Sequence, residues 1–280
     1  MTESSLLVEN SAPICIAGMH RSGTSTVAQL FHRCGLYLGQ KDALYGSQPA
    51  NPDGFWENRE YVAINSQILK MLGAGWDFPH PLAEGWHETE QLHPVRAQAE
   101  RLLKEFEGHE PWGWKDPRNS LTLPFWTSLL PELKVVVCLR NPLEVALSLQ
   151  KRNGSSYAFG LNLWTIYNQR LLEVLPPNQY IVTHYESYFY RPQIELRRLL
   201  DFLRLPASDQ LVAYARSSTL KDLRHHSVTI HQLLDADVPE QLLELYLRMC
   251  RKADWDHDHP TVLDSTNGSE AALQERRPVV

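Results

Sequence analysis

Short apolar runs alternate along the chain with longer segments in which apolar residues recur at helical spacing. The runs in residues 13–17, 134–142 and 179–188 are rich in β-branched residues and predict buried strands. A further strand end is predicted in PWGWKDPRN, where Pro117 interrupts it. Helices are predicted over residues 25–35, 60–75, 93–108, 121–133, 142–154, 159–175, 191–205 and 239–253. Strands that alternate with helices predict an α/β fold with a mostly parallel sheet.

The size and composition of the chain fit one ordinary globular domain. A chain of 280 residues, 43% hydrophobic and 21% charged, can bury one large core. We predict a single domain over residues 13–262, with flexible termini over 1–12 and 264–280. The net charge of −6 argues against a nucleic-acid partner, although a local group of cations can still bind a small anion.

The sequence predicts no targeting segment and no membrane span. The first 13 residues lack the basic flank and apolar run of a secretory signal, and no run approaches the roughly 18 to 20 apolar residues of a membrane span. The cysteines are scattered without a CxxC pair, which favours buried, reduced thiols and a cytoplasmic protein. The sequence gives no indication of the oligomeric state.

The stretch GMHRSGTS (18–25) follows the first strand and opens the first helix, where a phosphate-binding loop is expected. Its glycines have the spacing of G-x-x-x-x-G-K-[ST], but Thr24 replaces the lysine and the positive charge moves to Arg21. An ATP or GTP site also needs an acidic residue for magnesium at a second strand end, and here the strongest strand ends on Arg140. The residues expected around the anion are Gly18, His20, Arg21, Ser22, Gly23, Thr24 and Ser25.

A second anion site is predicted in RNPLEVALS (140–148). Arg140 closes a strand, Pro142 begins the following helix, and Ser148 lies two turns into that helix. A guanidinium can fork onto a phosphate, a hydroxyl can donate to it, and the helix start favours an anion. A ligand with two separate anionic groups would fit both loops.

The two loops, in this order, resemble the sulfotransferase family, which uses 3′-phosphoadenosine 5′-phosphosulfate (PAPS) as sulfuryl donor. WKDPR (114–118) is similar to a segment of bacterial sulfotransferases, and the resemblance runs from about Ile14 to about Leu205. It implies a P-loop NTPase-like three-layer fold, a mostly parallel central sheet flanked by helices. It also implies that the first loop holds the 5′-phosphosulfate and that Arg140 and Ser148 hold the 3′-phosphate, with no metal.

The chain departs from the cytosolic small-molecule branch of that family in two places. The RKG-containing loop near the C-terminus is missing, and the branch's catalytic histidine segment is not evident. Lys221 and Arg224 stand at a comparable position to the missing loop. These departures favour the bacterial, carbohydrate-type and tyrosylprotein-type branch.

The candidates for the general base are Glu57 in NPDGFWENR, Asp116 in WKDPR and one of the histidines. In the related branches a glutamate downstream of the first loop has this role, which favours Glu57. Among aromatic residues, desolvation would raise the pKa of this carboxyl toward a useful value. The structural alternative is that Glu57 caps the helix that begins near Glu60 or pairs with Arg59.

Lys115 and Arg21 are the candidates for stabilising charge on the departing group. Lys115 stands at a strand end, where open α/β sheets place their ligands. In the alternative, Lys115, Asp116 and Arg118 form an internal ion pair that fastens a turn. His20 is interpreted as a packing or supporting residue, and the aromatic residues Tyr157, Phe159 and Trp164 are assigned to the core.

The predicted activity is sulfuryl transfer from PAPS to an acceptor hydroxyl without a metal. The alternatives are a divergent P-loop kinase or NTPase and a non-catalytic PAPS- or PAP-binding protein. A sugar or glycan hydroxyl is the favoured acceptor, ahead of a peptide tyrosine or a lipid or polyketide alcohol. Segments 46–59, 75–90 and 152–160 are expected to build its pocket. DWDHDHP (254–260) is interpreted as a solvated stretch, not a metal site.

Overall fold

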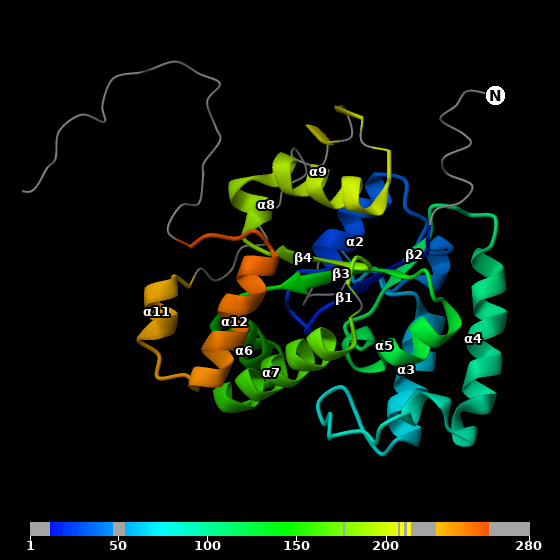
Figure 1. The fold of residues 1–280 in the computed structure, drawn as a ribbon, viewed down its shortest axis with the longest axis horizontal. Helices are drawn as coiled ribbons and strands as arrows, with labels where there is room; N and C mark the ends of the chain where they lie inside the picture. Colours follow the sequence, from blue (N-terminus) through cyan, green and yellow to red (C-terminus); the bar gives the residue numbers. More distant parts are fainter. Residues whose placement is uncertain are drawn as a thin grey trace, which may run out of the picture.

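Four parallel strands form the central sheet, in the order β2-β1-β3-β4 (Figure 1). The structure is a computed structural model that describes residues 12–46, 54–175, 177–206, 208–209, 212–213 and 228–257. Its strands are β1 (Ile14–Ala17), β2 (Gly113–Lys115), β3 (Lys134–Leu139) and β4 (Tyr180–His184). β1 pairs with β2 on one side and β3 on the other, so the loops after these three strands meet at one edge of the sheet.

Alternation of side chains along the strands gives the sheet two apolar faces. Ile14, Ile16 and Val136 point to one face, and Cys15 and Val137 point to the other. The first face is covered by α2 (Thr24–Arg33), α8 (Ser187–Tyr190) and α9 (Pro192–Leu203). The second is covered by α3 (Arg59–Met71), α4 (His93–Phe106), α5 (Asn119–Leu129), α6 (Pro142–Asn153), α7 (Tyr157–Val174) and α12 (Glu240–Lys252).

Figure 1 shows the resulting three layers, with α2, α8 and α9 on one side of the sheet and α5, α6 and α7 on the other. Short elements complete the described chain: η1 (Lys41–Ala43), η2 (Trp86–Glu88), η3 (Glu90–Leu92) and α11 (Ile230–Leu234). The predicted three-layer α/β fold with a parallel sheet is confirmed. Among the described residues, no helix combines the length and apolarity that a membrane crossing needs.

Helix ends follow the local signals in the sequence. Pro142 starts α6, and Gly154 closes it in the left-handed region at φ +69°. The helix predicted from residue 121 instead begins at Asn119, because the turn after β2 leads directly into it. Apart from Ala12, the predicted flexible termini lie outside the described residues.

Candidate active site

The loop between β1 and α2 turns on two glycines that leave no room for a side chain. A Cβ at Gly18 (φ +137°) would lie 2.5 Å from the carbonyl oxygen of Cys138. A Cβ at Gly23 (φ +86°) would lie 2.5 Å from the ring of Tyr185. The Gly18 N–H donates to Ser120 Oγ at 3.0 Å. The glycines therefore let β3 and the turn after β4 lie directly against this loop.

Arg21 and Ser148, predicted at two separate anion sites, are joined by a hydrogen bond. Arg21 Nε donates to Ser148 Oγ at 2.9 Å. Arg140 Nη1 donates to the backbone carbonyl of Arg21 at 3.2 Å. The two predicted anion loops consequently form one continuous polar surface at the carboxyl edge of the sheet.

Arg140 is held in one direction at the end of β3. Its Nε donates to Glu144 Oε2 at 2.7 Å, and its guanidinium lies 4.3 Å from the centroid of the Tyr185 ring. Trp164 is fully buried, as predicted, and donates from Nε1 to the Arg140 carbonyl at 3.0 Å, whereas Phe159, also assigned to the core, is exposed. Glu144 is also buried and accepts the Val228 N–H at 2.8 Å. The Glu144 carboxylate thus connects Arg140 to the segment that begins at Val228.

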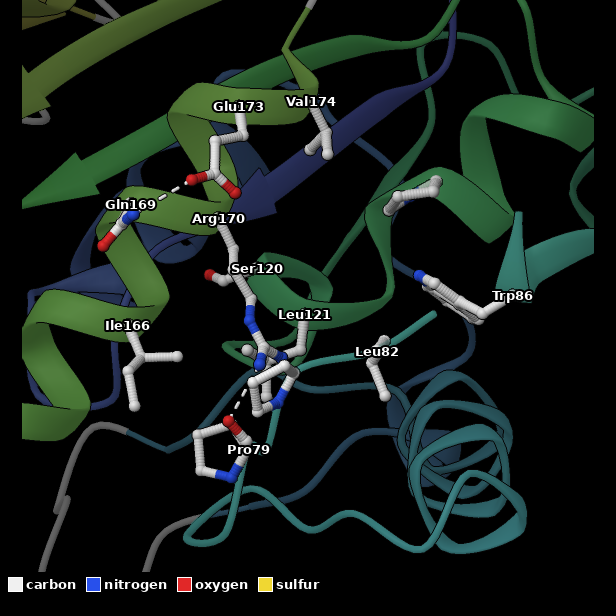
Figure 2. A pocket seen from close by; sticks show the side chains of 12 residues that line it. Pro79, Leu82, Trp86, Ser120, Leu121, Ile166, Gln169, Arg170, Glu173 and Val174 are labelled. Carbon is white, nitrogen blue, oxygen red and sulfur yellow. Dashed lines mark hydrogen bonds between the residues drawn. The ribbon is translucent and has the colours of Figure 1, made fainter. Parts of the chain in front are cut away.

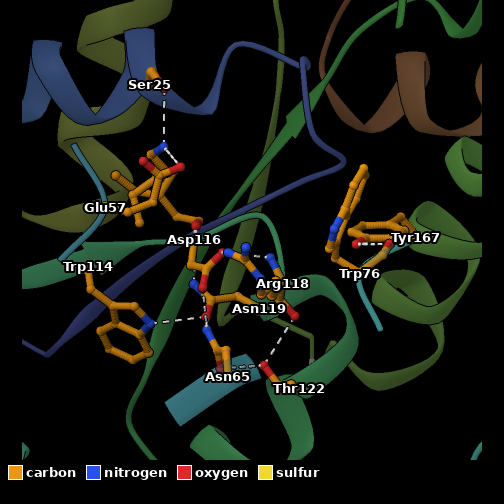
Figure 3. A network of polar contacts seen from close by, with 12 residues as sticks. Ser25, Glu57, Asn65, Trp76, Trp114, Asp116, Arg118, Asn119, Thr122 and Tyr167 are labelled. Atoms are coloured by element: carbon orange, nitrogen blue, oxygen red, sulfur yellow. Dashed lines mark hydrogen bonds and ion pairs between the residues drawn. The ribbon is translucent and has the colours of Figure 1, made fainter. Parts of the chain in front are cut away.

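Glu57 and Lys115 form a buried ion pair beside the start of α2. Lys115 Nζ donates to Glu57 Oε1 and to Ser25 Oγ, the latter at 3.2 Å. Figure 3 shows Glu57 next to Ser25, whose hydroxyl donates to the Phe55 carbonyl at 3.2 Å. Glu57 Oε2 is buried and has no hydrogen-bond partner in the described part of the chain. The predicted base and the predicted cation therefore lie in contact.

The bonding of the neighbouring residues excludes the capping role considered for Glu57. Asn58 caps α3 instead, with its side chain accepting the backbone N–H two residues on at 2.9 Å. Burial raises the pKa of Glu57 and lowers the pKa of Lys115, and the attraction between the two charges opposes both shifts. The pKa of Glu57 is thus moved toward the range in which a general base is efficient at neutral pH.

Asp116 is fixed in a buried polar network (Figure 3). Its Oδ2 accepts from Asn65 Nδ2 at 2.9 Å, and its Oδ1 accepts the backbone N–H of Arg118 at 3.0 Å and Nη1 at 2.9 Å. Asn65 also donates to Asn119 Oδ1 at 2.9 Å and accepts from Thr122 Oγ1 at 2.7 Å. Both oxygens of Asp116 are therefore occupied, which suits a structural role better than proton removal.

The ion pair considered for WKDPR is present only in part. Asp116 pairs with Arg118, whereas Lys115 turns to Glu57. The turn is consequently fastened by one of its two cations, and the other is directed into the site.

His20 packs inside the loop, as expected. Its ring centroid lies 4.9 Å from that of Trp76 and 6.0 Å from that of Tyr167. Figure 3 shows Trp76 beside Tyr167, whose hydroxyl donates to the Trp76 carbonyl at 2.7 Å. Burial lowers the pKa of His20 well below its usual value, and the neighbouring cations, Arg118 and Arg152 foremost, lower it further. His20 is therefore neutral at pH 7.

Arg152 belongs to the site, although the sequence analysis included it only in the acceptor segment 152–160 and not among the cations. It lies near the end of α6, one helical turn after Ser148, with its guanidinium 5.5 Å from the centroid of the Trp76 ring. Burial lowers its pKa, and repulsion from Arg118 lowers it further. The four-residue spacing from Ser148 was the available signal, since such residues share one face of a helix.

The cations that converge at this edge of the sheet outnumber the carboxylates. The cations are Arg21, Lys115, Arg118, Arg140 and Arg152, and the buried carboxylates are Glu57, Asp116, Glu144 and Glu186, the last of these beside Tyr185. Ser22 Oγ is buried without a hydrogen-bond partner among the described residues. Unpaired donors, glycine-lined backbone and net positive charge together suit an anionic ligand.

The described residues contain no group of three or more His, Cys, Asp or Glu side chains that could hold a metal ion. In DWDHDHP, Trp255 Nε1 donates to His257 Nδ1 at 3.2 Å. Residues 258–260 of that stretch lie outside the described part, as do Lys221 and Arg224.

The site can be compared with known proteins. The profile described as "Sulfotransferase family" matches residues 13–209. The chain belongs to the sulfotransferase family. This family member is 28% identical over 109 residues to a Caenorhabditis elegans protein named "Putative protein-tyrosine sulfotransferase", an alignment that covers 36% of the chain and 42% of the relative. The chain thus spans less than half the length of this curated relative.

Solved structures show the same fold. A sulfotransferase from Mycobacterium tuberculosis superposes with a TM-score of 0.53 at 14% identity, covering 87% of this chain and 78% of that one. The sulfotransferase domain of the Synechococcus PCC 7002 olefin synthase superposes with a TM-score of 0.51 at 15% identity, covering 88% and 97%. Because the sequence identity is so low, these structural similarities establish the fold alone.

Proposed function

We propose that the protein transfers the sulfuryl group of PAPS to an acceptor hydroxyl by in-line displacement, without a metal ion. One observation carries this proposal: the loop of residues 18–25 contacts two groups of side chains. Arg140 and Ser148 bond to Arg21 of this loop, and the buried pair Lys115 and Glu57 lies at Ser25. Residues 13–262 would form the sulfotransferase domain. Its four buried free cysteines favour the reducing cytoplasm.

The residues present fit the donor that the family uses. The loop after β1 lies side by side with Arg140, which follows β3, and Ser148 of α6, so that adjoining donors are available for its two anionic ends. When bound, PAPS supplies a sulfuryl group attached to a phosphate leaving group. The residues proposed to hold the 5′-phosphosulfate are Gly18, His20, Arg21, Ser22, Gly23, Thr24 and Ser25. Arg140 and Ser148 would hold the 3′-phosphate.

Glu57 is the proposed general base. Its Oε1 stays with Lys115, and its unpartnered Oε2 is the atom that would take the proton of the acceptor hydroxyl. A buried acceptor atom without a donor is costly, so a hydroxyl that reaches Oε2 gains a favourable hydrogen bond. Lys115 and Arg21 would stabilise the negative charge that develops on the leaving phosphate.

The rival activities make different demands on the same residues. A magnesium nucleotide needs a carboxylate where β3 ends, and this position is Arg140, locked by its own partner Glu144. A non-catalytic PAP-binding protein would not need the buried pair Glu57 and Lys115, because burying two charges costs desolvation free energy.

Three classes of acceptor are open. They are a sugar, a peptide tyrosine, which is the acceptor named for the nematode relative, and a lipid or polyketide alcohol.

Calorimetric titration with PAP, and separately with ATP and magnesium, tests the donor. We expect micromolar PAP affinity that Arg140→Ala weakens by about 1.5 to 3 kcal/mol, the usual contribution of a charged hydrogen bond. Arg101→Ala, at an exposed position on α4, is the matched control and should bind normally. Binding of ATP and magnesium without binding of PAP would refute the proposed function.

A further inference from the structure

A pocket of about 400 Å³ lies between the loop of residues 79–86, α5 and α7 (Figure 2). Its volume falls within the range of small-molecule sites. Apolar residues from all three elements line most of it, among them Pro79, Leu82, Trp86, Pro124 and Ile166. Of the three segments expected to build an acceptor pocket, 75–90 lines this one, and its described lining has no residue from 46–59 or 152–160.

Arg170 brings a positive charge into this apolar pocket. Its Nη2 donates to the carbonyl of Pro79 at 2.8 Å and to that of His80. Its Nη1 is buried without a hydrogen-bond partner in the described part of the chain. Glu173 is exposed and accepts from Gln169 at 3.0 Å, and Arg170 forms no ion pair with any described carboxylate. The guanidinium is therefore fixed by neutral carbonyls, and the exposed carboxylate of Glu173, which lines the same pocket, attracts it without forming an ion pair.

The pocket meets the loop of residues 18–25 at Ser120, and a neighbouring residue of α7, Tyr167, also contacts this loop. Ser120, which lines the pocket, accepts the N–H of Gly18 at 3.0 Å. Tyr167 lies one helical turn before Arg170 and contacts both His20 and Trp76. One face of α7 therefore contacts the loop through Tyr167 and lines the pocket through Arg170.

We propose that this pocket binds the non-reacting part of the acceptor, and that the acceptor is a hydroxy acid with an apolar ring or chain. Its apolar body would pack between Leu82, Trp86 and Ile166, and its carboxylate would meet Arg170. This assignment rests on the proposed sulfuryl transfer for the acceptor role. A sugar would need several polar groups to satisfy its hydroxyls, whereas this lining is mostly apolar.

Binding is tested with 8-anilinonaphthalene-1-sulfonate, a fluorescent aromatic anion, in the presence of saturating PAP. We expect the probe to bind the wild type. Its affinity should fall by about tenfold or more in Arg170→Gln, because a charged contact is lost. Ile166→Trp, which fills the pocket from a partly exposed position, should weaken binding to a similar degree. Arg101→Gln on α4 is the control and should change nothing. Unchanged affinity in both pocket variants, or no binding to the wild type, would overturn the proposal.

The acceptor role is tested by sulfation of 6-hydroxy-2-naphthoic acid and of 2-naphthol, which differ only in the carboxylate. We expect a lower KM for the acid in the wild type and a loss of this preference in Arg170→Gln, with the kcat for 2-naphthol unchanged. An equal KM for both compounds in the wild type would refute the acceptor assignment. Calorimetry with PAP on the same samples separates this failure from a failure of the proposed function, because the pocket variants leave the donor residues intact.

Discussion

Arg21 Nε and Ser148 Oγ lie 2.9 Å apart, although 127 positions separate them in the sequence. This hydrogen bond links the loop after β1 to the helix after β3, two elements that α/β folds bring together at the carboxyl edge of the sheet. Each partner was assigned to a different anionic end of the donor. The contact joins the two proposed anion sites into one connected set of side chains.

Glu144 should determine how well the protein recognises a 3′-phosphate. Its carboxylate orients Arg140 and accepts the Val228 N–H, and Glu144→Gln keeps the shape while removing the charge. We expect the Kd for PAP to rise about tenfold, the scale of one charged hydrogen bond, with little change for adenosine 5′-phosphate. Calorimetry with both nucleotides measures this, and Glu100→Gln on α4 is the exposed control. Equal losses for both nucleotides would contradict a specific effect on the 3′-phosphate.

Glu57→Gln should remove catalysis while donor binding persists. Loss of a general base typically costs about 100- to 10,000-fold in rate, so kcat should fall within that range while the Kd for PAP changes little. Asp116→Asn is the comparison, because that carboxylate serves the buried network; its main effect should be on stability. A kcat that survives Glu57→Gln would assign the base elsewhere.

The pH profile of the wild type should be bell-shaped. A base must be ionised, so activity is lost as pH falls through the Glu57 pKa, which burial raises above its usual value. A cation must stay protonated, so activity is lost as pH rises through the Lys115 pKa, which burial lowers. The acidic limb should disappear in Glu57→Gln. Measurement of kcat/KM from pH 5 to 10 tests both limbs, and an acidic limb retained by the variant would belong to another group.

Local patterns in the sequence predicted the strands and the long helices. The prediction of a strand over 179–188 was wrong at its end, because β4 stops at His184 and α8 begins at Ser187. The β-branched run that became β3 is buried along nearly all of its length, and α6 ends before Gly154, where the helix was predicted to end. The parallel arrangement followed from the alternation of strands and helices. These features depend on residues close in sequence, which is why they could be predicted.

The site was predicted less completely because its contacts join distant residues. Glu57 and Lys115 were each singled out, but nothing in their sequence context indicated that they pair with each other. Arg152 joins the cations only because α6 carries it to Trp76. Arg170 lies on α7, and its guanidinium is fixed by carbonyls of the loop that folds across this helix. These contacts depend on how distant elements pack together, and the local spacing of hydrophobic and polar residues does not encode that packing.

Gly23→Ala should destabilise the protein more than Gly35→Ala. Both glycines have positive φ, at +86° and +95°, so alanine is strained at either position. At Gly23 a Cβ would also lie 2.5 Å from the Tyr185 ring, whereas nothing lies within 4 Å at Gly35. Overpacking typically adds about 1 to 3 kcal/mol. Urea unfolding measures the two free energies of unfolding. Equal losses in both variants would show that the Tyr185 ring moves aside without a loss of stability.

His184 should make stability sensitive to acid. It is fully buried at the end of β4, its Nδ1 accepts the Glu186 N–H at 3.3 Å, and its Nε2 lies 3.0 Å from the Tyr246 hydroxyl. Both contacts suit a neutral ring. Burial lowers its pKa well below the usual value of 6.5, and His257 and Arg140 lower it further.

Because the folded-state pKa of His184 is lowered, the unfolded chain takes up a proton that the folded chain resists. Stability is therefore unaffected above the usual histidine pKa and falls as pH drops below about 6.5, by about 1.4 kcal/mol per pH unit at most for one proton. His184→Gln should reduce this slope between pH 6.5 and 5, although it lowers stability overall. His93→Gln, at an exposed position on α4, should leave the slope unchanged. Urea unfolding at each pH measures the slopes, and identical slopes in wild type and His184→Gln would show that His184 does not contribute to acid sensitivity.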